Sequence, residues 1–265
     1  MAGLGHFCLL ATAVFATLTA ALVRYGQGVP FCGAALINDR YVVTSAWCAG
    51  EAGSGSQVLL GRHVLGAPES SALRRTVTTV KIHPLYSEYF DQYNIAVLRF
   101  EPPVPLTTRV RPVCLSDAPY QRFSVHTITG WGTSSQAGFR GLVLKENRII
   151  TPFFSACSPM LPGLWMFPNT NMCGFRFGFG FVQRDAANRT MSATARAARQ
   201  NGGFIYDSCN GDIGSALILR VGDRWVADGV VNGGPACGPV IPGVFHQLHY
   251  SYRWIVESTQ DAAYC

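Results

Sequence analysis

The sequence predicts an all-β fold that is closed by a C-terminal helix. Short apolar segments alternate with turns rich in Gly and Pro, a pattern typical of β-barrels and β-sandwiches. Hydrophobic residues make up 48% of the 265 positions and charged residues 14%, which indicates a globular and not a disordered chain. This length allows one large all-β domain or two small ones.

The expected strands fall into two sets, one in each half of the chain. The first set is Ala34–Ile37, Tyr41–Ser45, Gln57–Leu60, Thr76–Ile82 and Ile95–Arg99. The second set is Ser124–Thr129, Leu142–Ile150, Ser215–Leu219, Trp225–Val231 and Gly243–Gln247. We find no internal repeat and no low-complexity linker between the two sets.

Two helices are expected. The segment Tyr250–Gln260 closes the chain, with Trp254 and Ile255 as buried anchors. The Ala-rich segment Asp185–Gln200 begins with a residue type favoured at helix N-caps and stops before the glycines of 202–203.

The N-terminal run Phe7–Val23 is apolar and ends in small residues at Ala20 and Ala21. This pattern predicts a secretory signal peptide over residues 1–21, followed by one domain over residues 22–265. A membrane anchor is the competing interpretation, but the run is short for a span and no basic cluster follows it. We therefore expect a secreted, extracellular protein with no membrane span.

The chain contains nine cysteines, of which Cys8 lies in the predicted signal peptide. The remaining even number in an exported chain predicts a disulfide framework, whose connectivity the spacing alone leaves open. The formal net charge is +6. Such an excess can favour anionic glycans, nucleic acid or membranes, whereas a soluble basic extracellular protein is the simpler interpretation. No segment resembles a nucleic-acid-binding motif.

Several motifs occur in the order found in one family. Cys209–Leu217 reads CNGDIGSAL and resembles the CxGDSGGPL nucleophile loop of chymotrypsin-like serine proteases. Phe31–Cys48, Asn94–Leu98 and Thr129–Gly132 resemble further motifs of that family, as do the segments 229–234 and 242–245. The resemblance extends from about Phe31 to Val256 and implies two six-stranded antiparallel β-barrels with the active site between them.

The three positions that match the catalytic triad hold Trp47, Asn94 and Ile213 in place of His, Asp and Ser. The family's reaction needs a hydroxyl nucleophile, an imidazole base and a carboxylate that orients the imidazole. The indole of Trp47 has no lone pair that accepts a proton near neutral pH, the amide of Asn94 carries no charge, and Ile213 has no side-chain heteroatom. The resemblance therefore implies an inactive homologue.

Other serines and histidines could be considered as replacements. These are Ser45, Ser215, His126, His246 and His249. None of them matches a catalytic position, so we interpret them as ordinary structural or surface residues.

Active members of the family insert a freed N-terminus beside the Asp of the nucleophile loop, here Asp212. The oxyanion hole would then use the N–H groups of Gly211 and Ile213. The segment after Arg24 matches the activation sequence poorly. Asp212 is therefore expected either to stay in a zymogen-like state or to find another donor. A further alternative is that the sequence lacks its true N-terminal strand, which would leave exposed barrel edges.

The resemblance implies three disulfides, Cys32–Cys48, Cys157–Cys173 and Cys209–Cys237. It leaves Cys114 and Cys265, for which we prefer a mutual pair, with an intermolecular bridge as the alternative. A further family bridge would need cysteines at His126 and about Leu219, and both are absent.

The resemblance also places Asp207 at the base of the primary specificity pocket, between walls that Gly234 and Gly243 keep open. A basic side chain could therefore dock, or the pocket is a vestige of common descent. Asn232 and Gly233 replace the usual Ser and Trp of the strand that pairs with substrate.

The segment Gly174–Tyr206 is an insertion relative to the family and contains several arginines, namely Arg176, Arg184, Arg189, Arg196 and Arg199. It is either a binding surface for an acidic partner or glycan, or a solvated loop. Asn188 begins a glycosylation sequon within it.

These observations favour a secreted, non-catalytic protease homologue that binds an extracellular protein, such as a protease or its substrate. It would act as a regulator or cofactor of extracellular proteolysis, with innate immunity as one setting. The alternatives are a cationic antimicrobial or glycan-binding protein on the same fold and a residual endopeptidase of trypsin-like specificity. We expect no cofactor and no metal.

Overall fold

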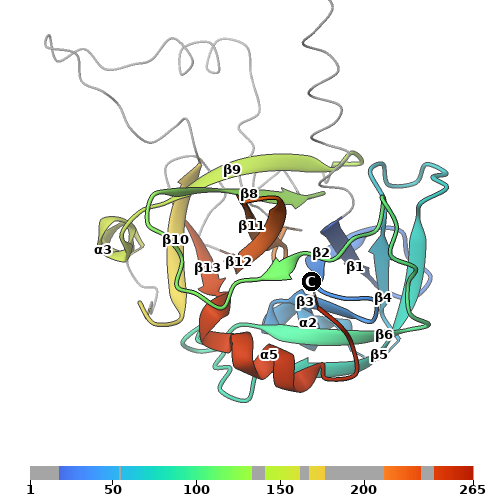
Figure 1. Ribbon diagram of the computed structural model, residues 1–265, viewed down its shortest axis with the longest axis horizontal. Coiled ribbons are helices and arrows are strands. Elements are labelled where there is room, and N and C mark those ends of the chain that lie inside the picture. Colours follow the sequence, from blue (N-terminus) through green and yellow to red (C-terminus); the bar gives the residue numbers. More distant parts are fainter. Residues whose placement is uncertain are drawn as a thin grey trace, which may run out of the picture.

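The computed structural model describes residues 18–53, 55–132, 141–161, 167–176, 212–233 and 242–264. Two β-barrels lie side by side, and the C-terminal helix packs along them (Figure 1). Several predictions fall outside the described residues, namely Asp207, Gly234, Asn188, Gly211, Cys209, Cys237, Cys265, most of the insertion and the helix Asp185–Gln200. They stay predictions.

The first barrel is a closed ring of six strands in the order β1-β2-β3-β6-β5-β4. Its strands are β1 (Thr19–Val23), β2 (Pro30–Leu36), β3 (Tyr41–Thr44), β4 (Gln57–Leu60), β5 (Leu73–Ile82) and β6 (Ala96–Glu101). Apolar side chains such as Leu22, Leu36 and Phe100 fill its interior and are fully buried. Burial of these side chains is the main force that holds the barrel together.

The second barrel is also formed by six antiparallel strands and closes through the pair β11–β12. Its strands are β8 (Ser124–Gly130), β9 (Lys145–Thr151), β10 (Asn171–Arg176), β11 (Ala216–Val221), β12 (Arg224–Gly233) and β13 (Gly243–Gln247). The short strand β7 (Cys114–Leu115) pairs with β12 in parallel. The predicted all-β fold of two six-stranded barrels is therefore confirmed.

Strand β1 differs from the predicted domain boundary. Thr19, Ala20 and Ala21 were assigned to the signal peptide, yet they pair with β2 on one side and, from Ala20, with β4 on the other. All five residues of β1 are buried. A chain that began at residue 22 would lose most of this strand and open the barrel at two edges. The domain therefore begins at or before Leu18, and the barrel does not lack its first strand.

The apolar Ala- and Thr-rich composition of β1 explains the difference, because a strand buried on both faces reads as a continuous hydrophobic run.

Strand β10 was also not predicted. It contains Gly174–Arg176, which pair with β9 and β13, so the insertion begins after these residues and not at Gly174.

The remaining elements are short helices. Helix α2 (Ala46–Ala52) follows β3, and α3 (Phe154–Cys157) is continued by the 3₁₀ turn η1 (Ser158–Met160). The predicted C-terminal helix is present as η2 (Leu248–Ser251) followed by α5 (Tyr252–Ser258). Its anchor Ile255 is fully buried, and Trp254 packs against the ring of His83 at 4.7 Å.

Two of the predicted disulfides, Cys32–Cys48 and Cys157–Cys173, are present. Cys114 is also disulfide-bonded. Its partner is not among the described residues, so its pairing with Cys265 stays a prediction. Across the described ranges, no helix has the length and apolarity that a membrane span requires.

Candidate functional site

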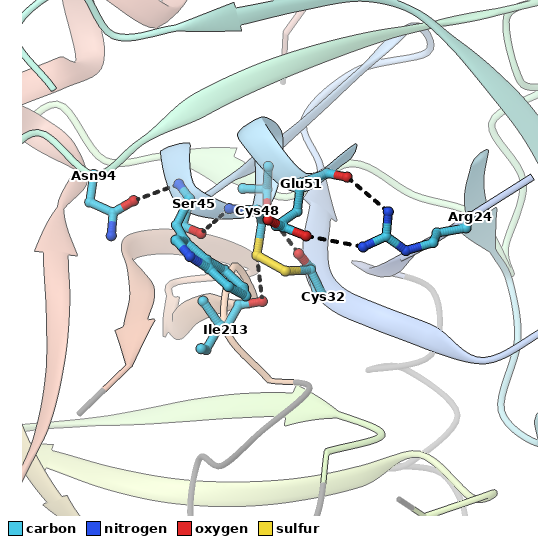
Figure 2. The surroundings of a disulfide bond; sticks show 10 residues. Arg24, Cys32, Ser45, Cys48, Glu51, Asn94 and Ile213 are labelled. Atoms are coloured by element: carbon cyan, nitrogen blue, oxygen red, sulfur yellow. Dashed lines mark hydrogen bonds and ion pairs between the residues drawn. A yellow bond between two sulfur atoms is a disulfide. The ribbon is translucent and has the colours of Figure 1, made fainter. Parts of the chain in front are cut away.

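The three positions singled out in the sequence lie at the junction of the two barrels. Trp47 is the second residue of α2, Asn94 precedes β6, and Ile213 precedes β11. The backbone N–H of Trp47 donates to Asn94 Oδ1 at 3.1 Å. Figure 2 shows Asn94 and Ile213 on either side of the start of α2, where the Cys32–Cys48 disulfide ties the helix to β2. The fold therefore joins Trp47 to Asn94 directly, and the Sγ of Cys48, the next residue of α2, lies 3.4 Å from the carbonyl oxygen of Ile213.

Helix α2 has a defined start because Ser45 caps it. The Oγ of Ser45 accepts a hydrogen bond from the N–H of Cys48 at 3.2 Å, which satisfies one of the free donors of the first turn. Ala46, Cys48 and Ala49 are buried, whereas the Trp47 side chain is 42% exposed. The cap and the buried face thus hold a large aromatic ring at the surface.

Ile213 presents an apolar side chain at the junction. Its carbonyl oxygen accepts a hydrogen bond from the N–H of Gly33 at 2.8 Å and lies 3.4 Å from Cys48 Sγ. Its side chain packs against the core of the first barrel. A Cβ at Gly233 would lie 3.6 Å from Ile213 Cδ1. Ile213 therefore lies directly beside the end of β12.

The side chain of Asn94 is hydrogen-bonded to the carboxylate of Asp91, a residue that the sequence motifs did not indicate. Asn94 Nδ2 donates to Asp91 Oδ1 at 2.6 Å, and Asn232 Nδ2 donates to Asp91 Oδ2 at 3.2 Å. Asn171 Nδ2 donates to the carbonyl oxygen of Asp91 at 3.3 Å. The carboxylate of Asp91 thus joins the segment before β6 to β12, and its backbone carbonyl joins the same segment to β10. The only sequence signal was an acidic residue three positions before Asn94.

Burial raises the pKa of Asp91 to about 6, although the hydrogen bonds from Asn94 and Asn232 work in the opposite direction. Within the described ranges no basic side chain pairs with Asp91. The backbone is also unusual here, since Asp91 and Tyr93 have φ values of 50° and 47°, in the left-handed region that residues other than Gly rarely occupy. Such conformations persist where the surrounding contacts enforce them, here the three amides around Asp91.

Asp212 has a donor within the domain. Its Oδ1 accepts a hydrogen bond from the N–H of Gly132 at 2.9 Å, and the side chain is buried. A Cβ on either Gly130 or Gly132 would collide with this carboxylate. Of the two expectations for Asp212, the structure therefore supports the second, another donor. The glycines of the TGWG segment are needed because the carboxylate approaches their backbone so closely.

Arg24 lies in the turn of the hairpin between β1 and β2. Its guanidinium forms an ion pair with Glu51 at 3.0 Å and lies over the ring of Phe31, with 5.2 Å from Cζ to the ring centroid. Figure 2 shows the contact with Glu51 next to the disulfide. A cleavage after Arg24 would separate β1 from β2 within one hairpin.

The other serines and histidines considered as replacements pack within the fold. Ser215 is buried beneath Gly33, where a Cβ on the glycine would collide with it. His246 is fully buried, its Nε2 lies 2.8 Å from Ser251 Oγ, and burial lowers its pKa to about 3. Burial also lowers the pKa of His249. Ser215 and His246 therefore provide no exposed replacement for a catalytic group.

His126 lies inside the second barrel. Its Nε2 is 3.0 Å from Asp228 Oδ2 and its Nδ1 is 3.4 Å from Thr151 Oγ1, and all three residues are buried. This Thr–His–Asp arrangement has no access for a substrate. It joins β8, β9 and β12 near the position where the resemblance would place a disulfide, so its role is structural.

Of the predicted pocket residues, the structure describes Asn232 and Gly243. Asn232 points its amide nitrogen to Asp91, and its Oδ1 is buried with no hydrogen-bond partner among the described residues. Gly243 pairs with Gly174 at the start of β13. No group of three or more His, Cys, Asp or Glu side chains in the described part of the chain could hold a metal ion.

The chain forms two β-barrels. At their junction lie the capped helix α2, the Cys32–Cys48 disulfide and the loop that carries Asp212. This arrangement is that of chymotrypsin-like proteins. The family model described as Trypsin matches residues 17–153, just over half of the chain. The chain therefore belongs to the trypsin family. The match begins just before β1, in agreement with a domain that includes this strand.

Curated relatives agree with this family. Trypsin-1 of Salmo salar is 28% identical over 89% of this chain and 84% of its own length. Coagulation factor IX of Cavia porcellus is 25% identical over 80% of this chain and 67% of its own length. Transmembrane protease serine 9 of Rattus norvegicus is 28% identical over 87% of this chain, which spans only 19% of that longer protein.

Proposed function

We propose that this chain is a secreted, non-catalytic member of the trypsin family that acts by binding another protein. The observation that carries the proposal is the set of side chains at the barrel junction. Trp47, Asn94 and Ile213 lie together there, and none of them can take a proton from a nucleophile or form an acyl intermediate.

The arrangement around Asp91 supports the same proposal. Its carboxylate accepts hydrogen bonds from the amides of Asn94 and Asn232. In active enzymes of the family, the position of Asn94 holds an aspartate, whose carboxylate contacts the catalytic imidazole and stabilises its charged form. An Asp→Asn change at that triad position lowers kcat by about 10⁴-fold. Here the amide substitution is combined with loss of the imidazole and of the hydroxyl, so no proton relay remains.

We propose that the partner is an extracellular protein, a protease or the substrate of one, and that the chain regulates or assists proteolysis. The half-exposed indole of Trp47 supplies an aromatic surface of the kind enriched in protein interfaces. The disulfides support export to an oxidising compartment. If an N-terminal signal is removed, its cleavage site must lie before Leu18, since β1 is part of the barrel.

The proposal is tested on protein secreted from eukaryotic cells. We expect no hydrolysis of peptides with Arg or Lys at the scissile bond and no labelling by a fluorophosphonate probe, with an active trypsin measured in parallel. Hydrolysis by the wild-type protein that is lost in Asp207→Ala would overturn the proposal. That result would favour the alternative that the names of the relatives suggest, a serine endopeptidase.

A gain-of-function variant provides a second measurement. The triple change Trp47→His, Asn94→Asp and Ile213→Ser restores the residue types that the reaction needs. If the remaining fold is competent, the fluorophosphonate probe labels this variant and not the wild type. Equal labelling of both proteins would show that a different nucleophile reacts and would contradict the proposal.

A further inference from the structure

A second candidate binding site lies on the first barrel, outside the Trp47–Asn94–Ile213 junction. It is a pocket of about 320 Å³, and the basic residues Arg62 and Arg74 are among those that line it. Leu59, Leu65 and Pro68 supply apolar lining, and Gly28 contributes backbone from the hairpin between β1 and β2. The pocket therefore combines two positive charges with an apolar wall.

Arg62 is only partly satisfied. Its Nη1 donates to the carbonyl oxygen of Ala67 at 3.0 Å, which holds the side chain in place. Its Nε is buried and has no hydrogen-bond partner among the described residues. A buried N–H without an acceptor is unfavourable. Because Nε is buried, a ligand would contact the guanidinium through its other N–H donors.

Arg74 reaches the pocket from β5, where its backbone pairs with that of Leu59. Its Nη1 donates to Gln57 Oε1 at 2.7 Å and to the carbonyl oxygen of Gln27 at 3.0 Å. These two acceptors orient the guanidinium, which carries five N–H donors in all. In the described part of the chain, neither Arg62 nor Arg74 forms an ion pair with a carboxylate.

The loop that carries Arg62 is held in a defined shape. Both carboxylate oxygens of Glu69 accept backbone N–H groups, from His63 at 2.8 Å and from Val64 at 3.0 Å. The N–H of Leu65 donates to the carbonyl oxygen of Leu142 at 2.7 Å, which ties the loop to the second barrel. The nearby acidic group is thus used within its own loop, and the pocket is formed before any ligand binds.

We propose that this pocket binds an acidic segment of a partner polypeptide, with a carboxylate against Arg62 and Arg74 and an apolar side chain over Leu59 and Leu65. Charge-assisted bonds to guanidinium groups would provide the specificity. The apolar wall favours a peptide over a sulfated glycan, because a glycan chain has little apolar surface to bury there. The hairpin that carries Gly28 also exposes Tyr25 (77%) and Val29 (59%), which extends the apolar surface beside the pocket. This site does not depend on the absence of catalysis at the barrel junction.

The test uses a fluorescently labelled, amide-capped peptide of sequence Glu-Leu-Glu-Phe-Glu, with Gln-Leu-Gln-Phe-Gln as its uncharged match. Fluorescence anisotropy is measured on the full secreted chain at two salt concentrations. We expect saturable binding of the Glu peptide only. Arg74→Gln and Arg62→Gln should each weaken it by about tenfold, the effect of losing one charge-assisted bond.

Arg75→Gln is the matched control, since Arg75 is the next residue on β5 and its guanidinium donates to the carbonyl oxygen of Pro102. It removes the same charge and should leave affinity unchanged. Equal weakening by Arg75→Gln, or no binding of the Glu peptide, would overturn the proposal. A heparin hexasaccharide that binds through Arg62 and Arg74 while the peptide does not would overturn it in favour of a glycan site. Thermal melting of each variant verifies that it is folded. Arg74 is exposed, so Arg74→Gln is expected to fold and provides the test if Arg62→Gln does not fold.

Discussion

Replacement of Asp91 by Asn should remove a pH-dependent destabilisation from the folded protein. The native carboxyl has a pKa of about 6, against an ordinary value of 3.8, so the folded state binds the proton more tightly than the unfolded state between these values. Stability contributed by the protonated form is therefore fully present below pH 4 and is lost as the pH rises through 6. The difference of about two pH units corresponds to about 3 kcal/mol.

The assay is urea unfolding of wild type and Asp91→Asn at pH 4.0 and pH 7.5, followed by tryptophan fluorescence. The free energy of unfolding of the wild type, relative to the variant, should fall by about 2 kcal/mol between these values, since most of the titration lies in this interval. All other groups titrate in both proteins, so their contributions largely cancel in the difference. The exposed Asp223, replaced by Asn, is the matched control and should show no such change.

A pH-independent difference between wild type and Asp91→Asn would refute the reasoning. It would mean that the amides of Asn94 and Asn232 stabilise the ionised carboxylate enough to cancel the effect of burial. A difference of opposite sign would mean that these hydrogen bonds outweigh burial, as they do for carboxylates with several donors.

Three further predictions concern the first barrel, the Asp212 loop and helix α2. A chain that begins at residue 22 should fail to fold and be retained in the secretory cell, whereas a chain that begins at Leu18 behind the same heterologous signal should be secreted, as measured by immunoblot of the medium. Gly132→Ala should destabilise the fold by several kcal/mol, because the new Cβ would collide with the carboxylate of Asp212, as measured by urea unfolding. Gly50→Ala, on the exposed side of α2 with open space for a Cβ, should instead stabilise it by about 0.5–1 kcal/mol.

The strands of the two barrels could largely be predicted from local patterns. Gln57–Leu60 and Gly243–Gln247 were predicted with the observed bounds, and most other strands were predicted to within a few residues. Alternation of apolar segments and turns carries this information, because each strand must bury one or both faces. The order of the family motifs singled out Trp47, Asn94 and Ile213, and the structure joins the backbone N–H of Trp47 to the side chain of Asn94.

Strand β1 shows where local pattern fails. An apolar run with small residues has the same composition whether it is an export signal or a strand buried on both faces. Only closure of the ring, with β1 between β2 and β4, distinguishes the two interpretations for Thr19–Ala21.

The sequence by itself determined the all-β class, the family motifs and the residue types at the catalytic positions, because these depend on periodicity and on side-chain chemistry along the chain. Only the tertiary structure decided that Asp91 is held by Asn94 and Asn232, and that Arg62 and Arg74 share one pocket. The physical reason is that Asn232 lies far along the chain from Asp91, and that Arg62 and Arg74 lie on different elements of the first barrel. The geometry of these contacts exists only once the strands have paired and the barrels have closed.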